Sequence, residues 1–171
     1  YVSMQAIILA AGEGTRMRPL TQHVPKPMVR AGEKNLIEQV IDVLPKEVDE
    51  VILVVGYLKE QIINHFGDEF GGRKITYVKQ KKPLGTEHAV ELCERLILDR
   101  FIILMGDGAY SKADIQEVVK HERAMMVYKI RGKFSGGNIV YDADGNLADI
   151  VEGAHITKGG VMNTNVFVLG R

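Results

Sequence analysis

The chain of 171 residues has a single cysteine, no tryptophan and no net charge. With Cys93 alone no internal disulfide can form, which is typical of proteins in a reducing compartment. The 22 Lys and Arg residues are balanced by 22 Asp and Glu residues, so the chain lacks the cationic excess that broad binding to nucleic acid or to an anionic membrane requires. The sequence therefore favours a cytoplasmic protein without a nucleic-acid partner, and it leaves room for one small anion site.

Long apolar runs are absent as well. The longest one near the N-terminus, Ala6–Ala11, is far shorter than the roughly 20 residues of a membrane-spanning helix, and no basic leader precedes it. We therefore expect no membrane partner. Hydrophobic residues (46%) and charged residues (26%) have ordinary globular proportions, and the length corresponds to one domain, which we place at residues 4–171.

Glycine, in contrast, is plentiful, and most glycines lie beside short apolar runs that are typical of buried strands. Periodic apolar segments between these runs predict helices. We expect strands at residues 5–10, 50–55, 74–78, 101–105, 125–130 and 165–169, and helices at residues 36–44, 58–66, 85–98 and 112–119. This alternation predicts an α/β fold in which a parallel sheet is covered on both faces. Asp-Gly within residues 143–146 predicts a hairpin turn, and hence an antiparallel addition in the last third of the chain.

Two of the helices carry specific signals. Asn35 followed by Glu38 has the pattern of a capping box, which predicts a helix start at this point. In the helix over 85–98, spacing predicts an apolar stripe that faces the sheet, made of Ala89, Leu92, Cys93 and Leu96. Cys93 is thus expected to be a core thiol and not a nucleophile.

The loop after the first strand, residues 11–26, has the composition of a polyphosphate site. Gly12 and Gly14 let the backbone approach an anion closely, and three cations follow, Arg16, Arg18 and Lys26. The loop has neither the Gly-Lys-Ser/Thr ending of a Walker A motif nor the third glycine of a dinucleotide fingerprint, and Pro19 stops a helix from starting there. A solvated glycine-containing loop is the alternative.

Two further segments follow strand ends, where open α/β sheets bind their ligands. Gln80 can donate to and accept from a nucleobase, and Gly85 lets a flat ring approach; the alternative is a Pro-Leu-Gly turn with Thr86 as helix cap. Asp107 lies between two glycines after the fourth strand. One such carboxylate suits Mg²⁺, which takes its other ligands from phosphate and water, whereas the alternative is an Asp that caps backbone N–H groups.

Together these segments resemble the sugar-phosphate nucleotidylyltransferases. The resemblance rests on Leu9–Thr21 (LAAGEGTRMRPLT), Pro25–Met28 (PKPM), Gln80 with Pro83–Ala89 (PLGTEHA), Met105–Asp107 followed by Tyr110–Lys112 (YSK), Val151–Glu152 and Asn163–Val168. It implies a three-layer Rossmann-like nucleotidyltransferase fold, with a mostly parallel central sheet and an added antiparallel hairpin. It also implies transfer of a nucleotidyl group from dTTP or UTP to a sugar 1-phosphate with Mg²⁺, and it leaves the choice of sugar and the formation of a homo-oligomer open.

The resemblance also implies roles for individual residues. Arg16 and Lys26 would be catalytic, Arg16 holding the β- and γ-phosphates and Lys26 the α-phosphate and the attacking phosphate. Asp107 would bind the metal. The nucleotide-binding set would be Leu9, Ala10, Ala11, Gly12, Gly14, Thr15, Arg16, Gln80, Pro83, Gly85 and Thr86, and the sugar-binding set Gly137, Glu152 and Asn163.

Three departures from the family pattern bear on activity. Gly153 follows Glu152 where the family has a lysine, Gly108 follows Asp107 where it has Asn or Asp, and a second metal-binding Asp is expected beyond Arg171. Two functions therefore remain open: an active nucleotidylyltransferase, or a nucleotide-binding relative with little catalysis that acts as a regulatory or interaction module. A NAD-binding domain is disfavoured by Pro19 and the missing third glycine.

Overall fold

The computed structural model describes residues 3–171, and for Ala154 the backbone alone. Four parallel strands form the centre of the main sheet: β1 (Met4–Ala10), β4 (Val48–Val55), β6 (Arg73–Lys79) and β7 (Arg100–Met105). Helices lie between them: α1 (Leu36–Asp42), α2 (Lys59–Phe66), α3 (Thr86–Glu91) and α4 (Lys112–Val118). The later strands are antiparallel: β8 (Ala124–Ile130), β9 (Phe134–Tyr141), β10 (Leu147–Ile156) and β11 (Gly160–Gly170).

Smaller elements complete the chain. These are the strands β2 (Arg30–Ala31), β3 (Lys34–Asn35) and β5 (Glu69–Phe70), and the 3₁₀ turns η1 (Thr15–Met17), η2 (Lys26–Met28) and η3 (Glu94–Leu96). β2 and β3 form a separate two-stranded sheet. Among residues 3–171, no helix combines the length and the apolar character that a membrane crossing demands.

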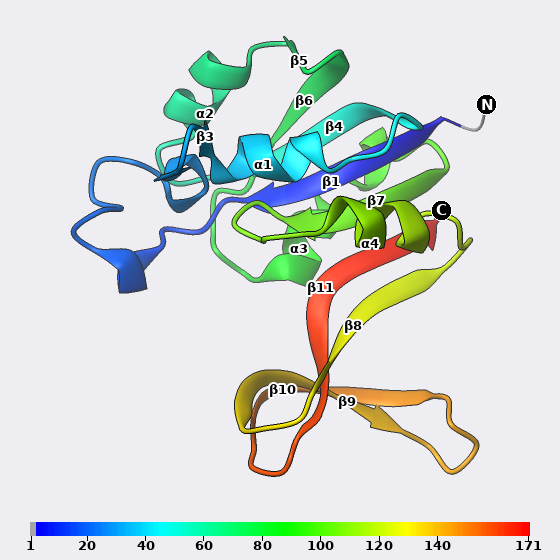
Figure 1. Cartoon of the computed structure of the whole chain (residues 1–171). Coiled ribbons are helices and arrows are strands. Elements are labelled where there is room, and N and C mark those ends of the chain that lie inside the picture. The colour runs from blue at the N-terminus through cyan, green and yellow to red at the C-terminus, as the bar shows by residue number, and fades with distance from the viewer. Residues whose placement is uncertain (1–2) are drawn as a thin grey trace.

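The order of the strands locates the ligand-binding edge. β1 pairs in parallel with β4 on one side and with β7 on the other, and β6 lies outside β4. Chain order therefore reverses between β1 and β7, and ligands of open α/β sheets bind outside the carboxyl ends of the strands at such a point. β11 runs antiparallel to β7 and carries β8 and the β9–β10 hairpin, which projects away from the parallel part (Figure 1).

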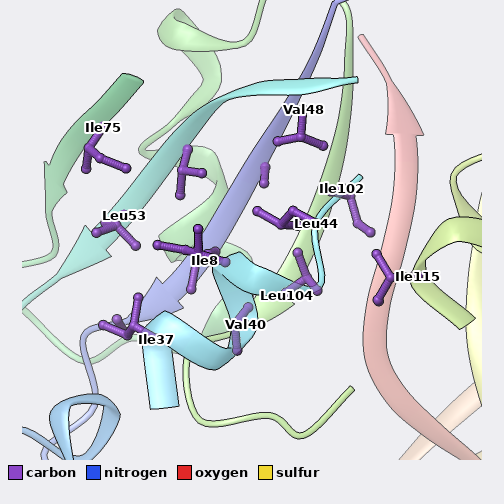
Figure 2. Close-up of a cluster of buried hydrophobic side chains, with 14 of the residues drawn as sticks. Ile8, Ile37, Val40, Leu44, Val48, Leu53, Ile75, Ile102, Leu104 and Ile115 are labelled. Atoms are coloured by element: carbon purple, nitrogen blue, oxygen red, sulfur yellow. The ribbon is translucent and has the colours of Figure 1, made fainter. Parts of the chain in front are cut away.

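Both faces of the parallel sheet are buried, as the alternation of strands and helices predicts. On one face Ile8 and Leu53 pack with α1, α2 and α4 (Figure 2). On the other face Ile7 and Ile52 pack with Ala89 of α3 and with Cys93 and Ile97, which flank η3. The strands are consequently apolar on both sides, which explains why they are continuous apolar runs and not alternating ones.

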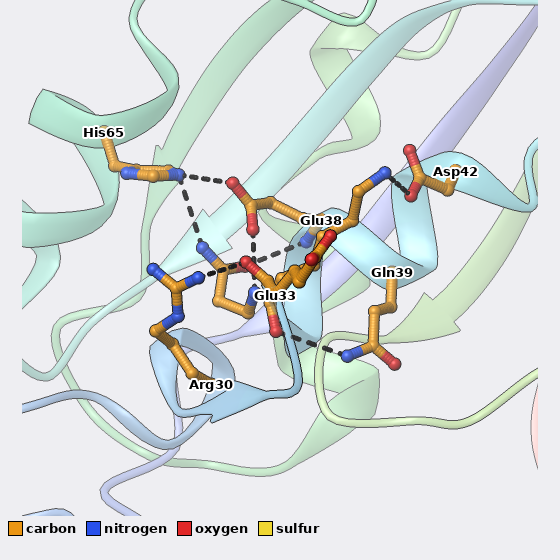
Figure 3. A network of polar contacts seen from close by, with 8 residues as sticks. Arg30, Glu33, Glu38, Gln39, Asp42 and His65 are labelled. Carbon is orange, nitrogen blue, oxygen red and sulfur yellow. Dashed lines mark hydrogen bonds and ion pairs between the residues drawn. The ribbon is translucent and has the colours of Figure 1, made fainter.

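The capping box of α1 is confirmed, and it belongs to a larger polar network. Asn35 Oδ1 accepts from the Glu38 backbone N–H at 2.9 Å, and the Glu38 carboxylate accepts from the Asn35 N–H at 2.7 Å. The same carboxylate lies 2.8 Å from His65 Nε2 on α2 (Figure 3). A local helix start therefore also ties α1 to α2.

Two predictions about elements are wrong. The helix over 85–98 is interrupted: α3 ends at Glu91 and η3 follows, and the buried stripe is Ala89, Cys93 and Ile97. Leu92 and Leu96 are 40% and 38% exposed, because the interruption rotates them away from the sheet. The strand at residues 124–130 is not part of the parallel series either. It pairs antiparallel with β11, a partner about 35 residues away that local pattern does not reveal.

Candidate active site at the carboxyl edge of the sheet

The loops after the parallel strands are held close to one another. Gly106, after β7, donates its N–H to Leu9 O of β1 at 2.8 Å. A Cβ built on Gly56, after β4, would lie 2.8 Å from Ala11 O and 3.1 Å from Gln80 O. Since any side chain at Gly56 would push these loops apart, glycine is what lets three strand ends meet there.

The loop over 11–26 is folded back on itself. Gly14 has φ 62°, a left-handed conformation that favours glycine, and a Cβ there would lie 2.7 Å from Lys26 Cβ. Thr21, which is completely buried, donates from Oγ1 to Gly14 O at 2.8 Å. The glycine turn and the cation at the far end of the loop are thereby brought together.

Two residues that sequence reasoning missed anchor the outside of this loop. Tyr57 donates from its hydroxyl to Gln22 O at 2.9 Å, and Gln61 Nε2 donates to His23 O at 2.7 Å. Both come from the turn and helix after β4, and no motif marks them. These two hydrogen bonds hold the backbone that lies between Arg18 and Lys26 to the body of the domain.

The cations of the loop differ in their partners. Lys26 forms an ion pair with Asp107, each side chain being less than one-third exposed. Arg18 Nη2 lies 3.7 Å from Glu13 Oε2, which makes an ion pair. Within residues 3–171, the exposed Arg16 side chain forms neither a hydrogen bond nor an ion pair. Of the three cations in this loop, Arg16 is therefore the one whose side chain no other described residue engages.

Tyr110 explains why glycine follows Asp107. A Cβ on Gly108 would lie 2.2 Å from the Tyr110 hydroxyl, so the phenol ring fills the space that a side chain would need. The hydroxyl accepts from Met105 N–H at 3.0 Å. Burial raises the pKa of Tyr110, as does the nearby Asp107, although the Met105 N–H lowers it. The phenol stays neutral and supports the end of β7.

A pocket of about 230 Å³ brings seven of the predicted nucleotide-binding residues together. It is lined by Leu9, Ala11, Gly12, Gln80, Pro83, Gly85 and Thr86, with Ala89 and Met105. Ala10 differs: it is 2% exposed and packs in the core with α1, because alternate residues of a strand face opposite sides. Gly14, Thr15 and Arg16 lie further along the loop, outside this lining.

The Gln80 side chain contacts one residue of its own loop and one residue of the helix that follows. Its Nε2 donates to Gly85 O at 3.0 Å and lies 3.0 Å from His88 Nδ1 on α3. His88 is thus in contact with the predicted base-reading amide.

The predicted sugar-binding residues also meet, although they come from three strands. A Cβ on Gly137 in β9 would lie 2.7 Å from Glu152 Oε1 and 3.3 Å from Asn163 Cβ. Asn163 is 7% exposed and donates from Nδ2 to Asn165 Oδ1 at 2.9 Å. Asn165 in turn lines a groove of about 620 Å³ together with Leu9, Thr86 and Met105. The groove therefore runs from the pocket of about 230 Å³ to β11.

Metal-binding capacity is small and centred on Asp107. Among residues 3–171, no group of three or more His, Cys, Asp or Glu side chains is arranged to hold an ion. One carboxylate beside the predicted phosphate-binding loop nonetheless fits Mg²⁺, which is commonly bound through one or two carboxylates and substrate phosphates. The donor set suits a metal that arrives with its nucleotide.

These features define an α/β protein with a glycine-containing cationic loop, a pocket of about 230 Å³ and a carboxylate at one sheet edge. Residues 5–152 match the model of the Nucleotidyl transferase family, and the chain belongs to that family. It is 37% identical over 149 residues to the bifunctional protein GlmU of Methanococcus maripaludis, covering 87% of this chain and 35% of that protein. It is 41% identical over 121 residues to the UTP–glucose-1-phosphate uridylyltransferase AglF of Haloferax volcanii, covering 70% and 49%. The chain thus spans a third to a half of the length of these relatives.

A solved structure agrees with the fold. The CTP:phosphocholine cytidylyltransferase LicC of Streptococcus pneumoniae superposes with a TM-score of 0.78 at 26% identity, over 99% of this chain and 72% of that one. The expected nucleotidyltransferase fold, with its mostly parallel sheet and antiparallel addition, is therefore confirmed.

Proposed function

We propose that this chain transfers a nucleotidyl group from dTTP or UTP to a sugar 1-phosphate. A phosphate oxygen of the sugar phosphate attacks the α-phosphorus, the bond from that phosphorus to the bridging oxygen breaks, and pyrophosphate leaves. Residues 4–171 would act as one domain. The observation that carries the proposal is the pairing of Lys26 with Asp107 at the strand ends beside the pocket.

Catalysis of this reaction needs positioning and charge stabilisation more than covalent chemistry. Arg16, exposed and without a side-chain hydrogen bond or ion pair among residues 3–171, would take up the β- and γ-phosphates and stabilise the charge that develops on pyrophosphate. Lys26 would release Asp107 and contact the α-phosphate and the attacking phosphate, aligning the two. Gly12, Gly14 and Thr15 would offer backbone N–H groups to the triphosphate.

Asp107 would hold Mg²⁺. When bound, the ion neutralises charge on the α-phosphate and the acceptor phosphate. Gly137, Glu152 and Asn163 would contact the sugar, because they lie together beside the groove that reaches the nucleotide pocket.

A second function is favoured by one observation. Gly153 has φ 68° at an irregularity in β10, a conformation that side chains other than glycine adopt only with strain. The lysine that the resemblance expects there is consequently hard to accommodate. The alternative is a nucleotide-binding relative with little catalysis.

The test is pyrophosphate release from dTTP or UTP with a panel of sugar 1-phosphates in Mg²⁺, alongside nucleotide-induced changes in melting temperature. Turnover supports the enzyme, whereas stabilisation by nucleotide without turnover supports the alternative. Arg16→Ala is expected to lower kcat by about 100-fold or more, because one charge-stabilising group is lost, and to leave the melting temperature unchanged. Arg18→Ala is the matched control, because Arg18 is already paired with Glu13. A wild-type rate for Arg16→Ala would refute its role.

A further inference from the structure

The amide of Gln80 is oriented by a partner that can only accept. Its Nε2 donates to Gly85 O at 3.0 Å, and a backbone carbonyl oxygen has no hydrogen to give. Turning the amide by half a revolution would set two oxygens against each other. The nitrogen of Gln80 therefore faces Gly85, and this orientation follows from chemistry alone.

His88 accepts a hydrogen bond from the second N–H of the same nitrogen. A primary amide nitrogen carries two hydrogens, and Nε2 also lies 3.0 Å from His88 Nδ1. Because the amide nitrogen cannot accept, Nδ1 must be the acceptor and the ring proton must be on His88 Nε2. With both hydrogens engaged, Oε1 is what Gln80 can still offer, and it is an acceptor.

Gln80 lines the pocket of about 230 Å³ that also contains Gly12, Gly85 and Met105. A base that meets an oxygen acceptor there needs an N–H on the facing edge. Uracil and thymine have one at N3 and guanine has one at N1. The corresponding ring nitrogens of cytosine and adenine are bare acceptors, so these two bases reach Oε1 only through the exocyclic amino group, which requires the ring to shift within the pocket. A bare nitrogen against Oε1 leaves two acceptors without a hydrogen between them, which is costly in a pocket.

We infer that His88 is a specificity-determining residue, positioning Gln80 so that the pocket selects bases with a ring N–H over cytosine and adenine. The inference rests on the proposed function, because it requires that a nucleotide occupies this pocket. His88 acts through Gln80 and need not touch the base. Without it, Gly85 O alone holds the amide, one hydrogen of Nε2 becomes free, and that hydrogen can be donated to a bare ring nitrogen.

The test measures dissociation constants of the full chain for UTP, dTTP, GTP, CTP and ATP in Mg²⁺ by calorimetry. We expect UTP and dTTP to bind about tenfold or more tightly than CTP and ATP. His88→Leu is expected to reduce the ratio of the CTP dissociation constant to the UTP dissociation constant by about fivefold or more. His88→Asn should retain most of the ratio, because the Asn oxygen can stand where Nδ1 accepts. Equal ratios in wild type and His88→Leu, or equal binding of CTP and UTP by wild type, would overturn the inference.

A second measurement needs no stable variant at residue 88. Nitrogen NMR of the wild-type chain reports which ring nitrogen carries the proton, and we expect protonated Nε2 and bare Nδ1 at His88. A proton on Nδ1 would overturn the inference and leave the proposed function standing. If none of the five nucleotides binds to the folded chain, the proposed function fails, and the inference with it.

Discussion

The parallel half of the sheet and its antiparallel half differ in how far their side chains are buried. In the parallel half all seven residues of β1 are buried, and helices cover both faces. In the antiparallel half, β10 has no buried residue among those whose side chains are described, and the β9–β10 hairpin stands away from the body (Figure 1). The predicted nucleotide site lies on the first half and the predicted sugar site on the second.

This difference has a physical consequence for how each site can change. Strands buried on both faces resist substitution, because every side chain has close-packed neighbours and a smaller one leaves a cavity. An exposed antiparallel ribbon tolerates new side chains on its open face. The part of the sheet with the predicted nucleotide site is consequently expected to resist substitution, whereas the part with the predicted sugar site is expected to tolerate it.

Matched core substitutions, one in each half, test this contrast most strongly. Ile8 and Ile139 are 0% and 5% exposed. Ile8→Ala is expected to lower the free energy of unfolding by about 4 kcal/mol, because the cavity lies between β1 and α1, where neighbours cannot close in. Ile139→Ala should cost about 2 kcal/mol, because an open ribbon relaxes around the loss. Urea denaturation followed by circular dichroism measures both, and equal costs would remove the contrast.

Neighbouring glycines in β9 test whether the acceptor site can be changed without touching the nucleotide site. Gly137→Ala places a methyl group where the Glu152 carboxylate lies, so Glu152 must move. We expect the KM for the sugar 1-phosphate to rise about tenfold, with the dissociation constant for the nucleotide unchanged. A tenfold change corresponds to about 1.4 kcal/mol.

Gly136→Ala is the control for this variant. A Cβ on Gly136 would lie 3.6 Å from Met162 Sδ, an ordinary contact, so its steady-state constants should equal those of wild type. Should Gly137→Ala weaken nucleotide binding as much as it raises the KM for the sugar phosphate, the two sites are not separable.

The same contrast shows what the sequence could and could not predict. The parallel strands, the cap of α1 and the loop with Gly14 and Lys26 were predictable, because each depends on short apolar runs or local backbone chemistry. The antiparallel pairing of β8 with β11 was not, since it joins segments far apart in the chain. The three residues that the resemblance groups as a sugar site, Gly137, Glu152 and Asn163, do lie together, and their contact with a sugar stays a prediction.

The contacts missed around the site share one property. No motif marks Tyr57, which contacts Gln22. Tyr110 belongs to a stretch that resembles the family, but its role beside Gly108 comes from where the fold places its ring. His88 was assigned no role for the same reason: its partner is the side chain of Gln80, eight residues away. Such contacts follow from tertiary packing and have no periodic signal.

The smallest effect we predict compares how a carboxylate is held in each half. Burial raises the pKa of Glu38, but the Asn35 N–H and His65 outweigh it, so the pKa lies below its ordinary value of 4.5. Asp142, at the hairpin turn, also has a lowered pKa, chiefly through the Asn146 N–H, but it is fully exposed. Glu38 thus links two helices (Figure 3), whereas Asp142 serves its own turn.

A carboxylate whose pKa is lower in the folded state stabilises that state above its unfolded pKa, and the benefit is lost as the pH falls through the folded value. Glu38→Gln is therefore expected to cost about 0.5–1 kcal/mol at pH 7 and progressively less below pH 4.5. Asp142→Asn should show the same sign and a smaller effect, because solvent screens an exposed charge. Urea midpoints of the three proteins from pH 7 to pH 3.5 measure this, and a cost of Glu38→Gln that does not shrink with falling pH would show that its charge contributes nothing to joining the helices.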